Sequence, residues 1–145
     1  MKRPCLKWCL WAGLALAVAF AAWVWLWPYE WNPDHGANCE IQGVALTIDR
    51  SYFWVEAHLT VNPKAQHDLS KPVFLQTAQG HRLEPADSTF ASPDGQLPRE
   101  IWFKFWLDST EIAGPLSLHL NGGKLLVKSN SNLPTRSAFF TSHRW

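Results

Sequence analysis

The stretch REIWFKFWLD, residues 99–108, carries the clearest structural signal in the sequence. Every second residue is apolar, and these residues are Ile101, Phe103, Phe105 and Leu107. The alternate positions hold Trp102, Lys104 and Trp106. Because successive side chains of a β-strand point to opposite faces of a sheet, this period of two predicts a strand with one face in a hydrophobic core.

Further segments extend this strand pattern along the chain. They are VALTID (44–49), YFWVEAHLTV (52–61), VFLQTA (73–78), LSLHL (116–120) and KLLVKS (124–129). Turn-forming residues separate them, at 49–51, 62–63, 79–80 and 121–123. The pattern predicts an all-β domain at residues 41–129, an antiparallel β-sandwich of about seven short strands, with a partly open barrel as the alternative.

The period also predicts which side chains are buried. The core positions are expected to include Phe53, Leu59, Phe103, Phe105 and Leu118. The opposite phase is expected to face outward, with Glu56, Lys104 and Ser117. In contrast, Asp87-Ser88-Thr89 is expected to form a turn, because Asp and Ser side chains bond their own backbone.

An uncharged segment of twenty residues, WCLWAGLALAVAFAAWVWLW at 8–27, precedes the β pattern. As a helix it would span about 30 Å, which matches the hydrocarbon core of a bilayer. Pro28 follows, where a helix can end. We therefore expect a cytoplasmic stub and transmembrane anchor at 1–28, in contact with the bilayer through residues 8–27, and a linker at 29–40.

Charges on both sides of this segment predict its orientation. Lys2, Arg3 and Lys7 precede it, whereas Glu30 and Asp34 follow it. By the positive-inside rule, the N-terminus lies in the cytoplasm and the β-domain lies outside. The alternative is a cleaved signal peptide, because Ala19-Phe20-Ala21 fits a cleavage site. Cleavage there would leave an apolar tail with nothing to bury it, so the sequence favours a retained anchor.

Tryptophan is concentrated at the ends of the apolar segment. The expected membrane-interface residues are Trp8 and Trp11 at one end and Trp23, Trp25, Trp27 and Trp31 at the other. Tryptophan favours the level of the lipid headgroups, so two groups at this separation indicate two interfaces. The stretch WVWLWPYEW, residues 23–31, is then the outer end of the anchor. An alternative role for Trp23, Trp27 and Trp31 is a helix face that docks on another membrane protein.

Three segments of the β region resemble telokin-like, immunoglobulin-type domains. They are HLTVNP (58–63), VFLQTAQGHRLEP (73–85) and the region from REIWFKFWLD (99–108) to GPLSLHLNGGKLLVKS (114–129). The resemblance lies in strand order and turn placement over residues 43–129. It implies an immunoglobulin-like sandwich, of the kind that bacterial proteins carry outside the inner membrane behind a lipid or single-helix anchor. The resemblance brings no functional motif, and the Cys–Trp–Cys core of antibody domains is absent.

The composition and motifs exclude several kinds of function. Charged residues make up 17% of the chain and the net charge is +1, so no basic surface for nucleic acid is expected. The six histidines and three cysteines form no metal-binding or disulfide pattern. His58 and His119 could hold a metal only if their strands were neighbours. The sequence also lacks the G-x-S-x-G motif of nucleophilic hydrolases, and we expect no catalytic, cofactor or metal site.

Large side chains in the outward phase are the remaining unusual feature. They are Tyr52, Trp54, Trp102 and Trp106, with Lys104 between the last two. Exposed aromatic patches mark interfaces, so these five residues form the candidate interface. Two alternatives stay open: one of these rows is the true core face, or the C-terminal tail at 130–145, with Phe139, Phe140 and Trp145, covers it. The tail could pack on the sandwich as a final strand, or it could be a docking tail.

The sequence therefore predicts a non-catalytic, single-pass protein of the bacterial inner membrane. Its exported domain is expected to act as an accessory or assembly subunit that docks on another membrane-associated protein. The alternative is an extracytoplasmic module that binds cell-envelope glycan or a metal, since aromatic rings can also stack on sugars.

Overall fold

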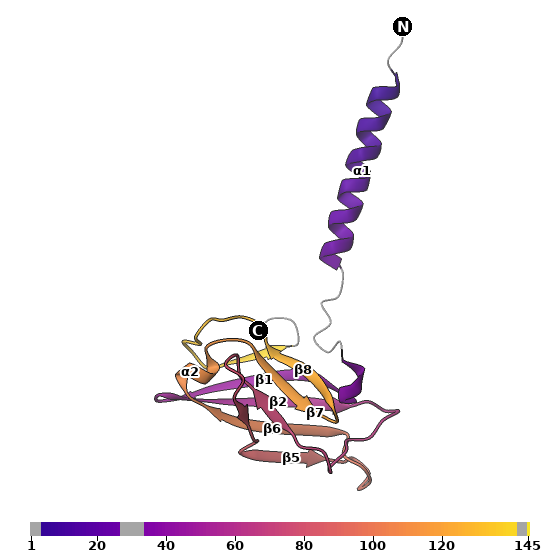
Figure 1. Cartoon of the computed structure of the whole chain (residues 1–145). Coiled ribbons are helices and arrows are strands. Elements are labelled where there is room, and N and C mark those ends of the chain that lie inside the picture. Colours follow the sequence, from indigo (N-terminus) through magenta and orange to yellow (C-terminus); the bar gives the residue numbers. More distant parts are fainter. Residues whose placement is uncertain (1–3, 27–33, 142–144) are drawn as a thin grey trace.

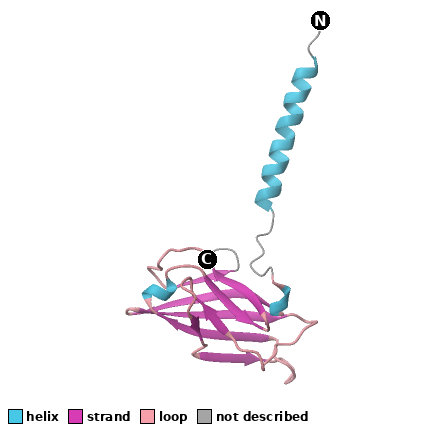
Figure 2. Ribbon diagram, viewed as in Figure 1, coloured by secondary structure: helices cyan, strands magenta, loops and turns pink. Residues whose placement is uncertain are grey.

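The computed structural model describes residues 4–26, 34–141 and 145. One long helix, α1 (Pro4–Leu26), precedes a β-domain made of two antiparallel sheets (Figures 1 and 2). Sheet A has the order β5-β6-β2-β1-β9, and sheet B has the order β4-β3-β7-β8. The strands are β1 (Cys39–Asp49), β2 (Tyr52–Val61), β3 (Phe74–Gln76), β4 (Arg82–Leu83), β5 (Asp87–Ala91), β6 (Glu100–Leu107), β7 (Leu116–Leu120), β8 (Gly123–Lys128) and β9 (Ala138–Thr141). Two short helices complete the domain, the 3-10 helix η1 (His35–Ala37) and α2 (Ser109–Ile112).

Three turns between paired strands lie where the sequence predicts them. Arg50, between β1 and β2, has a φ of 55°, and the β7–β8 turn has Asn121 at 54° and Gly122 at 86°. Two consecutive residues with positive φ are the hallmark of the two-residue hairpin turn whose twist matches that of the strands. Gly80, at 86°, lies in the connection between β3 and β4. The expected hairpins at 49–51, 79–80 and 121–123 are therefore confirmed.

The core lies between the two sheets and follows the predicted phase. Phe53, Leu59, Phe103, Phe105 and Leu118 are all buried in one cluster that both sheets share. On the opposite phase, Glu56 and Lys104 are partly exposed. The expectation that Ser117 faces outward into solvent is wrong, because Ser117 is buried. It lies on β7 between its register partners Gln76 and Leu126, whose longer side chains flank it.

Two strands add to the predicted number of about seven, and one of them is the final strand that the sequence left open for the tail. The expected turn at Asp87-Ser88-Thr89 is wrong, because these residues begin β5, which pairs with β6 at one edge of sheet A. The tail supplies the other edge strand, β9, which pairs with β1. Edge strands need only one partner and expose most of their side chains, so their sequences lack a clear apolar alternation. β5 accordingly has four exposed residues out of five.

A buried lysine ties the end of β8 to α2. A β-bulge between β7 and β8 pairs Leu116 with Lys128 and Ser117 with Leu126, which turns the Lys128 side chain inward. Its Nζ donates to the carbonyl oxygens of Ile112 at 3.0 Å, Gly114 at 3.1 Å and Asn130 at 2.8 Å. All three donors of the ammonium group are therefore satisfied without a carboxylate. Burial lowers the pKa of Lys128 below its usual value, because desolvation disfavours the charged form.

The helix α1 matches the expected anchor. Its 23 residues span about 35 Å, and the window Lys7–Val24 has a mean hydropathy of 1.6 and is not buried in the protein. The helix is therefore long and apolar enough to cross a membrane. The hydrophobic surface runs all round it, with Leu10, Leu14, Leu16 and Val18 all exposed. A helix that is apolar on every side is suited to a lipid surrounding.

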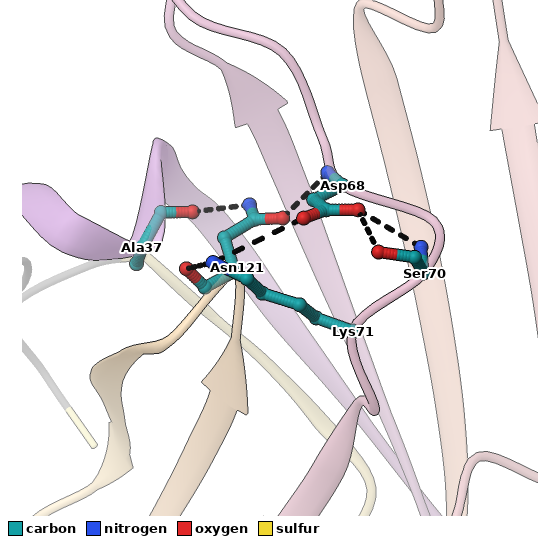
Figure 3. A network of polar contacts seen from close by, with 5 residues as sticks. All are labelled: Ala37, Asp68, Ser70, Lys71 and Asn121. Carbon is teal, nitrogen blue, oxygen red and sulfur yellow. Dashed lines mark hydrogen bonds and ion pairs between the residues drawn. The ribbon is translucent and has the colours of Figure 1, made fainter.

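The 3-10 helix η1 is fixed to the rest of the β-domain by Asn121. Its side-chain amide donates to the Ala37 carbonyl at 2.5 Å, and its side-chain oxygen accepts from the Asp68 backbone N–H at 2.7 Å (Figure 3). Lys71 Nζ donates to the Asn121 carbonyl at 3.2 Å. Nearby, the Asp34 carboxylate accepts from the Lys124 backbone N–H at 2.8 Å, and this bond is the main reason that the pKa of Asp34 is lowered. The β7–β8 turn thus holds η1 in place.

The core assignment predicts unequal losses at neighbouring positions of β6. Phe105→Ala should lower the free energy of unfolding by about 3–5 kcal/mol, because it leaves a cavity in the fully buried core. Lys104→Ala should cost less than about 1 kcal/mol, because its side chain is partly exposed. Denaturant unfolding of the full chain in detergent micelles, followed by tryptophan fluorescence, measures both. Equal losses at the two positions would contradict the strand phase.

Candidate functional site

The candidate interface occupies the outer face of sheet A. β2 and β6 pair in register, with Trp54 opposite Trp106, Glu56 opposite Lys104 and His58 opposite Trp102. Paired residues in an antiparallel sheet project on the same face, so these six side chains form three rows across two central strands. All six lie on the outer face of the sheet. The neighbouring positions Phe53, Phe103 and Phe105 point the other way, into the core. We call this set, together with Tyr52, the aromatic face.

Stacked rings organise the aromatic face. Tyr52 and Trp106 lie with ring centroids 4.3 Å apart and planes inclined by 26°. His58 and Trp102 stack with centroids 4.5 Å apart and planes inclined by 5°. The imidazole Nε2 of His58 is 3.9 Å from Glu100, too far for a hydrogen bond, and it has no hydrogen-bond partner. Each stack limits the positions that its two rings can take on the face.

Charged side chains fill the middle row of the aromatic face. Lys104 Nζ lies 4.9 Å from the centroid of the Trp54 ring, a cation–π contact. Glu56, its register partner, forms no ion pair among the described residues. The row therefore presents one acid and one base between two aromatic rows.

The five candidate residues lie together, but their exposure differs. Tyr52 is 42% exposed and Trp106 is 45% exposed, whereas Trp54, Trp102 and Lys104 are partly buried by their neighbours. None of the five belongs to the core cluster. The alternative that this row is the true core face is thus wrong, since the core lies on the opposite phase.

The C-terminal tail adds a strand beside β1, at the edge of sheet A away from β6. Phe140 pairs with Val44 on the inner face of sheet A and stacks on Trp145, with ring centroids 4.7 Å apart. Trp145 is buried in the core cluster, and its carbonyl accepts from the Ser129 hydroxyl at 2.8 Å. Of the tail aromatics, only Phe139 is on the outer face, where it is 65% exposed next to β1. Its ring occupies the space above Gly43, where a Cβ would collide with it.

A groove lies at the opposite edge of the domain, where β5 ends sheet A and β4 ends sheet B. Its volume is about 390 Å³, and its walls include His67, Lys71, Glu84, Ser88, Phe90 and Phe103. His67 Nδ1 is buried there without a hydrogen-bond partner. Desolvation is the main cause that lowers the pKa of His67. The groove combines a cation, a carboxylate and apolar walls, but nothing in it selects one ligand chemistry.

The residues examined for metal binding are dispersed. His58 lies in sheet A and His119 in sheet B, so they do not meet. His119 Nε2 lies 2.9 Å from Gln76 Oε1, and its ring stacks on Phe74. The described part of the chain contains no group of three or more His, Cys, Asp or Glu side chains placed to hold a metal. Cys39 is buried and free, and desolvation raises its pKa to about 11, which leaves the thiol protonated and unreactive near neutral pH.

The expected membrane-interface tryptophans are described in part. Trp8, Trp11 and Trp23 are exposed on α1, and the first and last lie near its two ends. Trp25 belongs to the same helix. Trp27 and Trp31 lie outside the described residues, as does the expected shared face of Trp23, Trp27 and Trp31.

No family model, curated protein or solved structure matches this chain. The candidate site therefore rests on the geometry of this chain alone. Sequence reasoning missed one member of the aromatic face, His58, and one further aromatic side chain on the outer face of sheet A, Phe139. His58 was considered only as a metal ligand, although its alternation with Trp54 on β2 already placed both on one face. Phe139 reached the outer face only through the pairing of β9 with β1.

The placement of the tail predicts different roles for two tryptophans. Trp106→Ala should lower the free energy of unfolding by about 1 kcal/mol, because only the stack on Tyr52 and partial burial are lost. Trp145→Ala should cost about 3–5 kcal/mol, because it empties part of the core. Thermal or denaturant unfolding of both variants of the full chain makes the comparison. A loss at Trp106 as large as that at Trp145 would mean that the aromatic face is covered within the chain.

Proposed function

We propose that this protein is a non-catalytic, single-pass membrane protein whose β-domain docks on another membrane-associated protein through the aromatic face. One observation carries the proposal: the outer face of sheet A holds two pre-stacked aromatic pairs, away from the core. Tryptophan and tyrosine at an interface contribute large contact area at a small loss of side-chain entropy. In this role the domain is an accessory or assembly subunit.

Strand order supports an immunoglobulin-like class for the domain. If β1, β2, β5 and β6 are read as strands A, B, D and E, sheet A contains the order D-E-B-A of immunoglobulin domains. Sheet B then has the order C′-C-F-G, with β4, β3, β7 and β8. β9 is an additional strand beside A. An experimental structure with a different strand order would contradict this classification.

We also propose that α1 anchors the protein in the bacterial inner membrane, with its N-terminus in the cytoplasm and the β-domain in the periplasm or outside the cell. The support is an apolar helix of membrane-spanning length, with basic residues in the sequence before it. The β-domain has its own core, as an exported domain needs.

The topology predicts two results. Protease added to spheroplasts should digest the β-domain, because it lies on the outer side of the membrane. The mass of the purified protein should include residues 8–27, because the anchor is retained. Full protection from the protease would reverse the orientation, and a chain that starts near Ala22 would show a cleaved signal peptide.

The docking role predicts the loss of a partner without loss of the fold. The full chain should be tagged at its N-terminus, because Trp145 is buried, and extracted in mild detergent. Trp106→Ala should reduce the yield of a stoichiometric membrane partner by about tenfold or more, as expected for a tryptophan that contributes a large share of the binding energy.

A matched control is Leu133→Ala, because Leu133 is 51% exposed in the connection between β8 and β9 and belongs to neither β2 nor β6. Its partner yield should equal that of the wild type. An unchanged yield in Trp106→Ala would reject the docking role. Retention on peptidoglycan that Trp106→Ala abolishes would instead favour the alternative, a module that binds cell-envelope glycan.

A further inference from the structure

We infer that the partner of the aromatic face is a second copy of this chain, bound about a two-fold axis that runs parallel to β2 and β6 and midway between them. The inference rests on the proposed function, because it names the membrane-associated protein that the same face binds. The observation that carries it is the register of β2 and β6.

Each row of the aromatic face holds two residues that suit one another: two aromatic rings, or an acid and a base. Two copies of the same row are therefore complementary when the second copy has its two residues in the reverse order. The rows are Trp54 with Trp106, Glu56 with Lys104, and His58 with Trp102. A two-fold axis that lies in the plane of the interface and runs parallel to the strands places β2 of one copy over β6 of the other. Each residue then faces, in the second copy, the residue with which it is paired in its own chain. Glu56 of one copy then meets Lys104 of the second copy, twice, while aromatic rings meet aromatic rings in the rows on either side. A two-fold interface requires this reciprocity, in which residue i contacts residue j and residue j contacts residue i.

The charges of the middle row exclude the other simple arrangement. A two-fold axis in the same plane but perpendicular to the strands, at the level of the middle row, would place Glu56 over Glu56 and Lys104 over Lys104. Like charges in a desolvated interface are strongly unfavourable. Glu56 has no ion pair among the described residues of its own chain, so its carboxylate is free to accept from a lysine of the second copy.

The direction of the chain fits the same axis. Rotation about an axis parallel to the strands keeps the first residue of β1, Cys39, at the same end of both copies. Both chains therefore approach from one end, as two proteins anchored in one membrane must. The perpendicular axis would send the two starting points to opposite ends. Restriction of both copies to one membrane also raises their effective concentration, so a modest interface suffices.

The test uses charge reversal in two differently tagged full-length copies that are co-expressed and extracted in mild detergent. Wild-type copies should co-purify. Two copies of Glu56→Lys should lose co-purification by about tenfold or more, because lysine then faces Lys104 at both contacts. Two copies of Lys104→Glu should lose it to the same extent. One copy of each variant should restore it to within about twofold of the wild type, because opposite charges meet again at both contacts.

The mixed pair also controls for folding, since two misfolded variants would not restore association. Equal co-purification of all four combinations would place the contact elsewhere, for example on α1, and overturn the inference. Failure of wild-type copies to co-purify, or failure of the mixed pair to recover, would also overturn it. If copies of the chain never associate but Trp106→Ala still loses a different membrane protein, the inference fails and the proposed function stands. If neither association responds to changes in the aromatic face, both fail.

Discussion

The antiparallel pairing of β2 with β6 determines the character of both faces of sheet A. Eight consecutive residue pairs join the two strands, from Phe53 with Leu107 to Thr60 with Glu100. A shift of one residue would move every side chain of a strand to the opposite face, exposing phenylalanines and burying Lys104 and Glu56. The cost of such a shift is large on the core side. The register that the core demands therefore also fixes the order of rings and charges on the outer side, so the core and the aromatic face are two results of one pairing.

The parts of the fold that the sequence predicts well are those whose signal is local. The alternation in β2 and β6 gave the correct phase, and turn-forming residues marked the turns correctly at Asp49-Arg50-Ser51 and Asn121-Gly122. Elements that depend on distant partners were missed. β5 is polar, exposed and formed only because β6 lies beside it. Lys128 is buried because a bulge in the β7–β8 pairing adds one residue and reverses the expected phase, which no local period reveals.

The candidate site shows the same division. The alternation of side chains along each strand was enough to place five residues on one face from the sequence alone: Tyr52, Trp54, Trp102, Lys104 and Trp106. It could not show which residues would stand opposite one another, because register depends on the pairing of two strands that residues 62–99 separate in the sequence. The stack of His58 on Trp102 and the row of Glu56 with Lys104 are products of that register. Similarly, the position of Trp145 in the core depends on the path of a tail that has little pattern of its own.

The attachment of η1 by Asn121 and Asp34 has a mechanical consequence. Tension in the chain that precedes Asp34 would first reach hydrogen bonds to the β7–β8 turn, and then β1, which is held by β2 on one side and β9 on the other. A pull along a strand loads its cross-strand hydrogen bonds in parallel, as a shear, so that many must break together. A pull at an edge strand from the side would break them one after another, like a zipper. The chain enters the β-domain through the eleven-residue strand β1, so a pull directed along β1 would load its pairing with β2 and β9 as a shear.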